Sequence, residues 1–462
     1  MSAMPVGAQT DISPAVLRAR RNLLGLYFLT GIAVATWLAR LPSIRGALDL
    51  TTAGLGTVLV VGSIGSLLMV VVAGGLTNRW GSARTLLVAA VMFSVANVMV
   101  GIGPAVGSVP VLAVGMLISS SSYALGNVPL NLETVVIERA MGRTVVPQFH
   151  AAFSVGSVVG SLLGAGVSWL GVPVVWHFIG LSVVTFAWRY LAIPGAVLPL
   201  TGGTAAVDAG DEGQGVAARP TPTRGASMRV AFAAWREPRT LLIGVIVLVA
   251  ALSEGSANNW LSLAVVDGFR QTEAVGAVMF GVFVGAMTVA RLAGTWVIDR
   301  FGRVAVLVAS GVSSIMGLLL FGTGPSLATA AAGAAAWGLG TGLMFPVGMA
   351  AVSGDRLRMA GRVAVVSSFA SVAAIAAPPL IGLAAEGMGI RHALLLALGG
   401  FVLSILLART VDTPEVAPGA VASERAPEVT DPARPATDPA RPAADPARPA
   451  TDPGRTVAVG TC

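Results

Sequence analysis

Long apolar stretches recur along this chain of 462 residues, separated by polar turns. Each is about 20 residues long, the length that an α-helix needs to cross the hydrocarbon of a bilayer. Backbone groups in hydrocarbon need partners within the chain, and the alternating strands of a membrane barrel are not seen, so the stretches must be helices. We expect twelve spans: Asn22–Leu41, Ala53–Thr77, Thr85–Gly103, Val109–Leu132, Val146–Leu170, Pro173–Ile193, Leu241–Val265, Ala274–Ile298, Val304–Gly322, Leu327–Val352, Val363–Ala384 and His392–Ala408.

The composition also indicates that the chain lies in a lipid bilayer. Apolar residues make up 55% of the chain and charged residues only 11%, whereas a soluble domain carries about 25% charged residues. A surface that faces water on all sides cannot be built from so few charges. We therefore predict an all-α membrane protein that crosses the cell (inner) membrane many times, is surrounded by the lipid bilayer and is monomeric.

The basic residues indicate how the chain is oriented. All 29 are arginine, and 18 of them fall in the N-terminal segment, the even-numbered loops and the start of the C-terminal tail. By the positive-inside rule we expect both termini to be cytoplasmic. The same asymmetry accounts for the net charge of +7, so we expect no nucleic-acid partner. Four arginines lie in the odd-numbered loops: Arg40, Arg45, Arg270 and Arg391.

One eleven-residue phrase occurs twice, at residues 74–84 and 295–305, each time between two apolar stretches. Its core is Asn78-Arg79-Trp80-Gly81 in the first copy and Asp299-Arg300-Phe301-Gly302 in the second. In both, the glycine can take a positive φ and reverse the chain between two helices. Shorter matches between the fourth and tenth spans, and before the fifth and eleventh, extend the likeness. We predict twelve transmembrane helices in two six-helix repeats.

The repeats divide the chain into five segments. A cytoplasmic N-terminal segment (1–21) precedes the first six-helix bundle (22–193), and a cytoplasmic linker (194–240) leads to the second bundle (241–409). The last segment (410–462) repeats Asp-Pro-Ala-Arg-Pro-Ala, has no apolar seam and is rich in proline, which bars a helix. We expect it to be a disordered cytoplasmic tail.

Parallel repeats of this kind leave a cavity near the midplane, and rocking of the halves can expose it to either side. Nothing in the sequence indicates an enzyme: hydrolase and metal-site signatures are absent, and no lysine exists for an ATP-binding Gly-x4-Gly-Lys motif. The lone Cys462 excludes an internal disulfide and a cysteine metal cluster. We therefore expect no cofactor and no metal, and a solute that is carried on the energy of an ion or solute gradient.

The motif Gly74-x-Leu76-x-Asn78-Arg79-x-Gly81, its second copy Asp299-Arg300-x-Gly302-Arg303 and the twelve-span layout resemble the major facilitator superfamily. The resemblance implies a transporter fold in which the motif residues form a charge latch that fastens the cytoplasmic helix ends in the outward-open state. Asn78 stands where the first copy usually has an acid, so the first latch is uncharged on that side.

A narrower resemblance rests on the fourth and fifth spans. The stretch from Asn127 to Asn131, then Gly142-Arg143, then Phe149-His150-Ala-Ala-Phe-Ser154, is similar to the fucose-permease-like and rhizopine-transporter-like branch, as is Trp37-Leu-Ala-Arg40. That branch implies small polyhydroxy or amino-sugar-like solutes. Its fucose symporters use carboxylates on the first and fourth spans for proton coupling. Here the first span has no acid and the fourth has Asn127 near that place, so proton symport does not carry over directly.

Polar residues on the fourth and fifth spans are candidates for solute contact. Asn127 and Asn131 share a helix face, and carboxamides pair well with solute hydroxyls; the alternative is a hydrogen bond between helices. On the fifth span His150 and Ser154 belong to one polar stripe, beside a stripe of glycines that we expect to pack against another helix. The serine could instead bond its own backbone, and the histidine could be a packing residue.

The seventh span carries Glu254 and Asn258 on one face, followed by Asn259 and Trp260. An ionisable group within a span costs about 2.5–3.5 kcal/mol to insert, so Glu254 is a candidate for solute binding or proton coupling. The alternative is an ion pair with Arg291 of the eighth span. Trp37 and Trp260 could stack on the apolar face of a sugar, or lie at the outer interface as belt residues.

We therefore expect a secondary active transporter of a small polar solute that works by alternating access, with protons as the candidate coupling ion. Import and export, and proton coupling and facilitated diffusion, stay open. In the same fold, an exporter of apolar drugs is favoured by the valine, leucine and methionine of the spans and disfavoured by the paired amides. An alternative of another class is a membrane sensor or scaffold that does not transport and signals through its tail.

Overall fold

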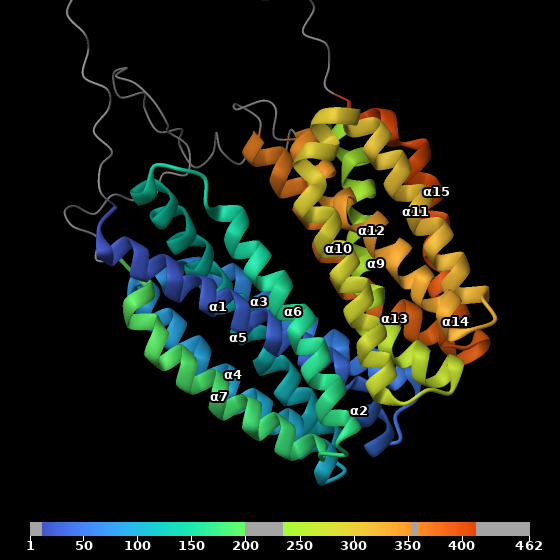
Figure 1. The fold of residues 1–462 in the computed structure, drawn as a ribbon, viewed down its shortest axis with the longest axis horizontal. Helices are drawn as coiled ribbons and strands as arrows, with labels where there is room; N and C mark the ends of the chain where they lie inside the picture. The colour runs from blue at the N-terminus through green and yellow to red at the C-terminus, as the bar shows by residue number, and fades with distance from the viewer. Residues whose placement is uncertain (1–11, 199–233, 353–358, 413–462) are drawn as a thin grey trace, which may run out of the picture. The chain divides into compact units, whose positions relative to one another are not determined.

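The computed structural model describes residues 12–198, 234–352 and 359–412, which form helices and turns with no strand among them (Figure 1). The predicted tail from residue 413 onward, most of the predicted linker and the first eleven residues lie outside this part of the chain.

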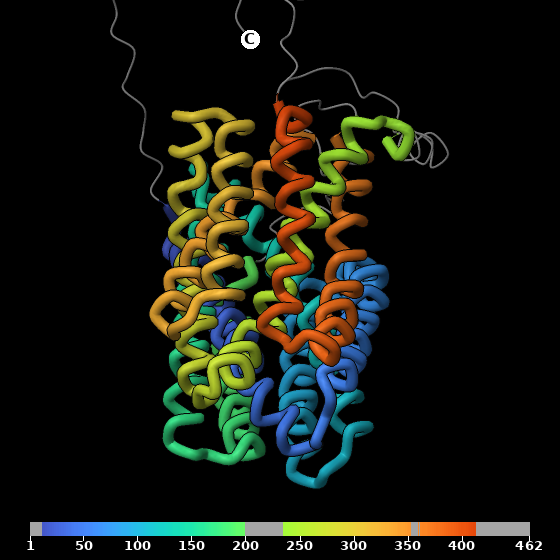
Figure 2. The backbone as a smooth tube through the Cα atoms, turned by 90° about the vertical axis from the view of Figure 1, so that its right-hand side faces the viewer, coloured from blue at the N-terminus to red at the C-terminus, as the bar shows by residue number. Residues whose placement is uncertain are grey.

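The N-terminal half consists of α1 (Pro14–Ala39), the short α2 (Leu41–Ala47), α3 (Thr52–Trp80), α4 (Ser82–Ala105), α5 (Val109–Met141), α6 (Val146–Trp169) and α7 (Val174–Ala196). The C-terminal half consists of α9 (Pro238–Phe269), α10 (Glu273–Phe301), α11 (Arg303–Thr323), α12 (Leu327–Val352), α13 (Met359–Met388), α14 (Ile390–Ala393) and α15 (Ala397–Leu406), with 3-10 turns at Leu394–Leu396 and Ala408–Val411. Figure 2 shows the long helices of both halves running along one common direction.

The twelve-helix prediction is confirmed. Eleven helices of the described residues are long and apolar enough to cross a membrane, and the run Ile390–Leu406 supplies a shorter twelfth. The predicted first span continued to Leu41, but α1 ends at Ala39 because Pro42, at the start of α2, lacks the N–H that a continuing helix needs. Helix α5 continues to Met141, beyond the predicted end at Leu132.

The internal repeat is visible in the ends of α3 and α10, which have 29 residues each. Each begins after a threonine, Thr51 or Thr272, whose side chain accepts a hydrogen bond from the backbone three residues on. Each ends at a glycine with nearly the same positive φ, 80° at Gly81 and 78° at Gly302. Few side chains tolerate this conformation, so the glycine of the repeated phrase makes the turn that the sequence predicts.

The two halves also pack alike. In the N-terminal half α1 packs on α6, α3 on α5, and α4 on both α5 and α7; the C-terminal half repeats this with α9 on α13, α10 on α12, and α11 on both α12 and α15. Between the halves, α6 contacts α10 and α3 contacts α13, and the repeat relates these two pairs to each other. These two pairs make the most extensive contacts between the halves, and α1, α2 and α9 add smaller ones.

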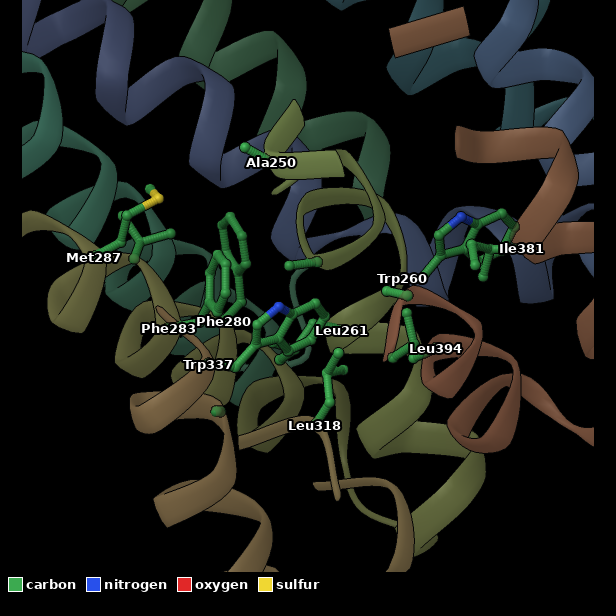
Figure 3. Close-up of a cluster of buried hydrophobic side chains, with 14 of the residues drawn as sticks. Ala250, Trp260, Leu261, Phe280, Phe283, Met287, Leu318, Trp337, Ile381 and Leu394 are labelled. Carbon is green, nitrogen blue, oxygen red and sulfur yellow. The ribbon is translucent and has the colours of Figure 1, made fainter. Parts of the chain in front are cut away.

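The interior of the C-terminal half is packed by aromatic side chains (Figure 3). Trp337 of α12 is fully buried, with its ring centroid 5.0 Å from that of Phe283 of α10. Its Nε1–H donates to the hydroxyl of Ser253 of α9 at 2.8 Å, the kind of partner that a buried indole needs. These contacts join three helices that carry the candidate site.

The predicted glycine stripe of α6 packs against α1. A Cβ placed on Gly156 would lie 2.0 Å from the carbonyl oxygen of Phe28, and one on Gly160 would lie 2.4 Å from that of Ile32. No side chain fits at these distances, so the small residues allow the two backbones to approach closely.

We expect Gly156→Ala to destabilise the protein by about 1–3 kcal/mol, because the new methyl group must force α1 and α6 apart. The measurement is the apparent melting temperature of the purified protein in detergent. Gly166→Ala is the matched control, since Gly166 lies on the same helix with no atom within 4 Å of a new Cβ. Equal melting temperatures for the two variants would contradict the packing.

Candidate functional site

A cavity lies between the two halves in two adjoining lobes. The first, of about 700 Å³, is lined by α1, α4, α5, α6, α7, α10 and α12; the second, of about 630 Å³, is lined by α1, α3, α4, α5, α6, α9, α10, α12 and α13. Tyr123, Ser154 and Arg291 line both lobes, so the lobes meet at these side chains. The volume suits a small organic molecule.

The halves are bonded to each other at one end, which we call the closed end and which carries Arg40, Arg45 and Glu273. The other end carries the turns at Gly81 and Gly302, and we call it the open end. Among the described residues no hydrogen bond or ion pair joins the halves there. The inter-half bonds lie at the closed end or between it and the middle of the helices: Arg40, Ser43 and Ser168 with Glu273, Arg45 with Asp267, Ala53 with Glu386, Ser63 with Ala374, and Ser161 with Ala277.

The carboxylate of Glu273, at the first position of α10, is the centre of the closed end. It accepts from the backbone N–H of Ser43 at 2.9 Å, from the hydroxyls of Ser43 and Ser168 at 2.7 and 2.6 Å, and it pairs with the guanidinium of Arg40 at 3.1 Å. Arg40 also donates to the carbonyl oxygen of Val172 at 2.9 Å. The side chains of Arg40 and Glu273 are only 4% and 10% exposed, so both charges depend on these partners.

This cluster was not predicted because Arg40 was expected to lie in a loop, where a charged side chain is normally solvated. The signal was present: Arg40 and Glu273 are rare charges in odd-numbered loops, and they carry opposite signs. Helix α2 turns the chain after Arg40 and brings Ser43 against the start of α10.

Glu254 and Arg291 form the ion pair that the sequence left as an alternative. Arg291 donates from Nη2 to a carboxylate oxygen of Glu254 at 2.9 Å, and its Nε donates to the carbonyl oxygen of Gly342 at 3.4 Å. Both charged side chains line the second lobe and are a quarter to a third exposed. The pair lies within the C-terminal half, between α9 and α10, and does not bridge the halves.

The neighbours of Glu254 on α9 separate into two sets. Asn258 and Asn259 line the second lobe, as does Trp37 of α1. Trp260 does not: it is fully buried in the core of the C-terminal half, against Gly382 (Figure 3). The predicted roles of Trp260 in stacking on a solute or in an interfacial belt are therefore wrong, because two residues along a helix turn its side chain away from the Asn258 face.

The amides of the fourth span lie in the first lobe. Asn131 donates to the side-chain oxygen of Asn127 at 3.0 Å and accepts from the hydroxyl of Tyr27 at 3.1 Å. The hydrogen bond between helices, which was the alternative, is thus present, and both amides still line the cavity. His150 lines the same lobe, with its ring steeply inclined to that of Tyr27 and the centroids 5.7 Å apart, and Ser154 lines both lobes.

Arg189 of α7 is a second arginine in the cavity, and the sequence analysis did not select it. Its guanidinium carbon lies 4.4 Å from the ring centroid of Phe93, and both side chains line the first lobe. Near the end of a span an arginine is easily taken for an interfacial residue. The flanking Trp188 and Tyr190 are exposed, which turns Arg189 toward the cavity.

The predicted latch residues gather at the open end. Asn78 and Arg79 end α3, Asp299 and Arg300 end α10, and all four side chains are exposed, without a hydrogen bond or ion pair to any residue that the structure describes. Gly81 and Gly302 form the two turns, and Arg303 begins α11. The structure thus places the predicted latch where the halves are not bonded.

Relatives and solved structures support the same family. The model of the Major Facilitator Superfamily matches residues 243–449. An uncharacterized transporter, y4wD, of Sinorhizobium fredii is 28% identical over 80% of this chain and 92% of its own length. The membrane protein MosC of Rhizobium meliloti is 24% identical over 80% of this chain and 84% of its own.

Three solved structures share the fold. The nucleoside transporter NupG has a TM-score of 0.67 at 16% identity, over 85% of this chain and 98% of that one. A bacterial homolog of the lysosomal transporter Spinster, inward-facing and unoccupied, has a TM-score of 0.66 at 14% identity, over 88% and 98%. The E. coli fucose:proton symporter FucP has a TM-score of 0.57 at 14% identity, over 85% and 98%.

The family model matches mainly the C-terminal half, whereas the relatives align with most of the chain. The solved structures have the same fold. Together these comparisons support a membrane transporter of the major facilitator superfamily.

Proposed function

We propose that this transporter moves a small polar solute, a sugar, polyol or amino-sugar-like molecule, by secondary active transport with alternating access. The observation that carries the proposal is the cavity between the halves, which combines amide and hydroxyl groups with apolar and aromatic walls. Among the residues that the structure describes, bonds between the halves close it at one end only. A sugar has hydroxyl edges and an apolar ring face, and needs both kinds of wall.

The polar groups of the cavity are placed to form hydrogen bonds with the hydroxyls of a solute. The amides of Asn127 and Asn131 and the phenol of Tyr27 form one chain of hydrogen bonds in the first lobe, and Asn258 and Asn259 lie in the second. NupG is a nucleoside transporter and FucP is a fucose:proton symporter; nucleosides and fucose both carry hydroxyl groups, which supports this class. The apolar lining of the first lobe favours a second candidate, export of apolar drugs.

The arrangement of the two ends supports alternating access. If the arginine-rich loops are cytoplasmic, as the positive-inside rule predicts, the closed end faces outward and the cavity is accessible from the cytoplasm. In the opposite state the bonds of Glu273 must break, and the motif residues around Asp299 and Arg300 would fasten the open end. The inward-facing Spinster homolog is a solved structure with a similar arrangement of helices.

Glu254 is the proposed coupling residue. Because Glu254 and Arg291 belong to one half, rigid rocking of the halves leaves the pair intact. The pair is broken only by a proton that binds Glu254, or by a polar solute that reaches the second lobe and bonds to one of the two side chains. A proton taken up by Glu254 would release Arg291 toward the cavity, which is a direct link between the ion and the solute site.

We expect sugars or polyols to raise the melting temperature of the purified protein in a panel that also contains amino sugars, amino acids and apolar drugs. Asn131→Ala should remove this stabilisation, because it deletes the amide that Tyr27 and Asn127 share. Thr144→Ala, at an exposed position between α5 and α6 and outside the cavity, is the control and should keep it. Stabilisation by the apolar drugs alone would favour the exporter and contradict our proposal.

We expect Glu254→Gln to abolish uphill accumulation in proteoliposomes of the solute that gives the largest stabilisation, while counterflow exchange persists. Binding survives the loss of charge, but the ion step does not. Because this variant leaves Arg291 without its partner, the double variant Glu254→Gln with Arg291→Gln is measured beside it. If Glu254→Gln accumulates solute uphill with the pH dependence of the parent, the ion pair is structural.

We expect Glu273→Gln to open the closed end. Breaking a buried pair costs several kcal/mol, so a cysteine at Asn258, in a Cys462→Ser background, should react about tenfold faster or more with an impermeant thiol reagent outside intact cells. Asp267→Asn is the control, since the pair with Arg45 is more exposed and such pairs contribute about 0–1 kcal/mol. Unchanged labelling in Glu273→Gln would contradict the gate, and fast labelling in the parent would contradict the orientation.

A further inference from the structure

We infer that Arg189 and Phe93 form a carboxylate subsite and that the solute is a polyhydroxylated monocarboxylate, a sugar acid. This inference rests on the proposed function and names the chemistry of its solute. Three observations carry it: where Arg189 lies, what it contacts, and how the charges of the cavity are paired.

Arg189 lies within an apolar helix and not at its end. Arg189 lies seven positions before Ala196, the last residue of α7, which corresponds to about 10 Å along the helix axis. An arginine that only anchored the helix would extend toward the open end. Instead its guanidinium lies over the ring of Phe93, in the wall of the first lobe.

The other charges of the cavity are already matched. Glu254 is the only carboxylate among the described residues that line the two lobes, and it is paired with Arg291. Arg189 makes no hydrogen bond or ion pair with any residue in the described part of the chain. Apart from His150, the lining therefore carries one uncompensated positive charge. Such a charge in a low-dielectric cavity attracts an anion strongly.

The contact with Phe93 leaves the N–H groups of Arg189 free to bind a solute. The aromatic ring covers the face of the guanidinium, while the N–H groups at its edge remain available. This planar edge matches a carboxylate through two parallel hydrogen bonds. A single positive charge suits a monoanion, whereas a phosphate dianion would leave an excess negative charge. The amides of Asn127 and Asn131, in the same lobe, are placed for the hydroxyls.

The test compares sugars that differ only in the carboxylate. Binding of glucuronate against glucose, and of galacturonate against galactose, is measured on the purified full-length protein in nanodiscs by calorimetry and thermal shift. We expect the parent to bind each acid at least about tenfold more tightly than its neutral partner, the ratio typical of one hydrogen-bonded charge pair.

Two variants and a control locate the effect. Arg189→Gln should abolish the preference for the acids while its affinity for the neutral sugars stays within about threefold of the parent, which also shows that the variant is folded. Arg189→Lys should restore part of the preference, because it keeps the charge but not the planar edge. Arg139→Gln, at an exposed position near the end of α5, should keep the preference of the parent.

The outcomes that overturn the inference are distinct. Equal affinity for acids and neutral sugars in the parent, or a preference that survives in Arg189→Gln, would overturn the subsite and leave the proposed function standing. Tighter binding of glucose 6-phosphate than of glucuronate would overturn the monocarboxylate. Failure of both the acids and the neutral sugars to bind the parent would overturn the proposed function and the inference together.

Discussion

The closed end depends on one carboxylate. Glu273 belongs to the C-terminal half, but the four donors that we find on it, from Arg40, Ser43 and Ser168, all belong to the N-terminal half. A buried charge of this kind is stable only while its partners are in place. The network therefore has two clear states, formed or broken, and the broken state requires the halves to separate at this end. We propose that this network, with the other bonds between the halves, controls access to the cavity from that side.

The second ion pair, between Glu254 and Arg291, joins helices of the same half. Glu254 and Arg291 lie on neighbouring helices of one half, so movement of the halves does not strain their bond. In our proposal the two carboxylates divide the work that a coupled transporter needs. Glu273 would respond to the position of the halves, whereas Glu254 would respond to what occupies the cavity. Coupling arises if the occupied cavity changes how readily the closed end opens, since both sites act on α10.

The fold followed from the sequence because its main determinants are local. The length of the apolar stretches set the number of helices, and the glycine of the repeated phrase predicted turns that the structure forms at Gly81 and Gly302. Only part of the candidate site could be predicted from the sequence. Which side chains meet depends on the rotation and tilt of each helix, and these are set by packing across the bundle. Trp260 was assigned to the cavity and lies in the core. Arg40 was placed in a loop and is buried, and Arg189, which was not selected, lines the cavity.

The central claim is that the two ends of the cavity open in turn. Spin labels can measure this, in a Cys462→Ser background, with one pair across the closed end at Ala47 and Met388 and another across the open end at Ala140 and Met359, all exposed positions. Distances would be recorded in nanodiscs for the parent and for Glu273→Gln. The account predicts that Glu273→Gln lengthens the Ala47–Met388 distance and shortens the Ala140–Met359 distance. Unchanged distances, or both distances changing in the same direction, would contradict it.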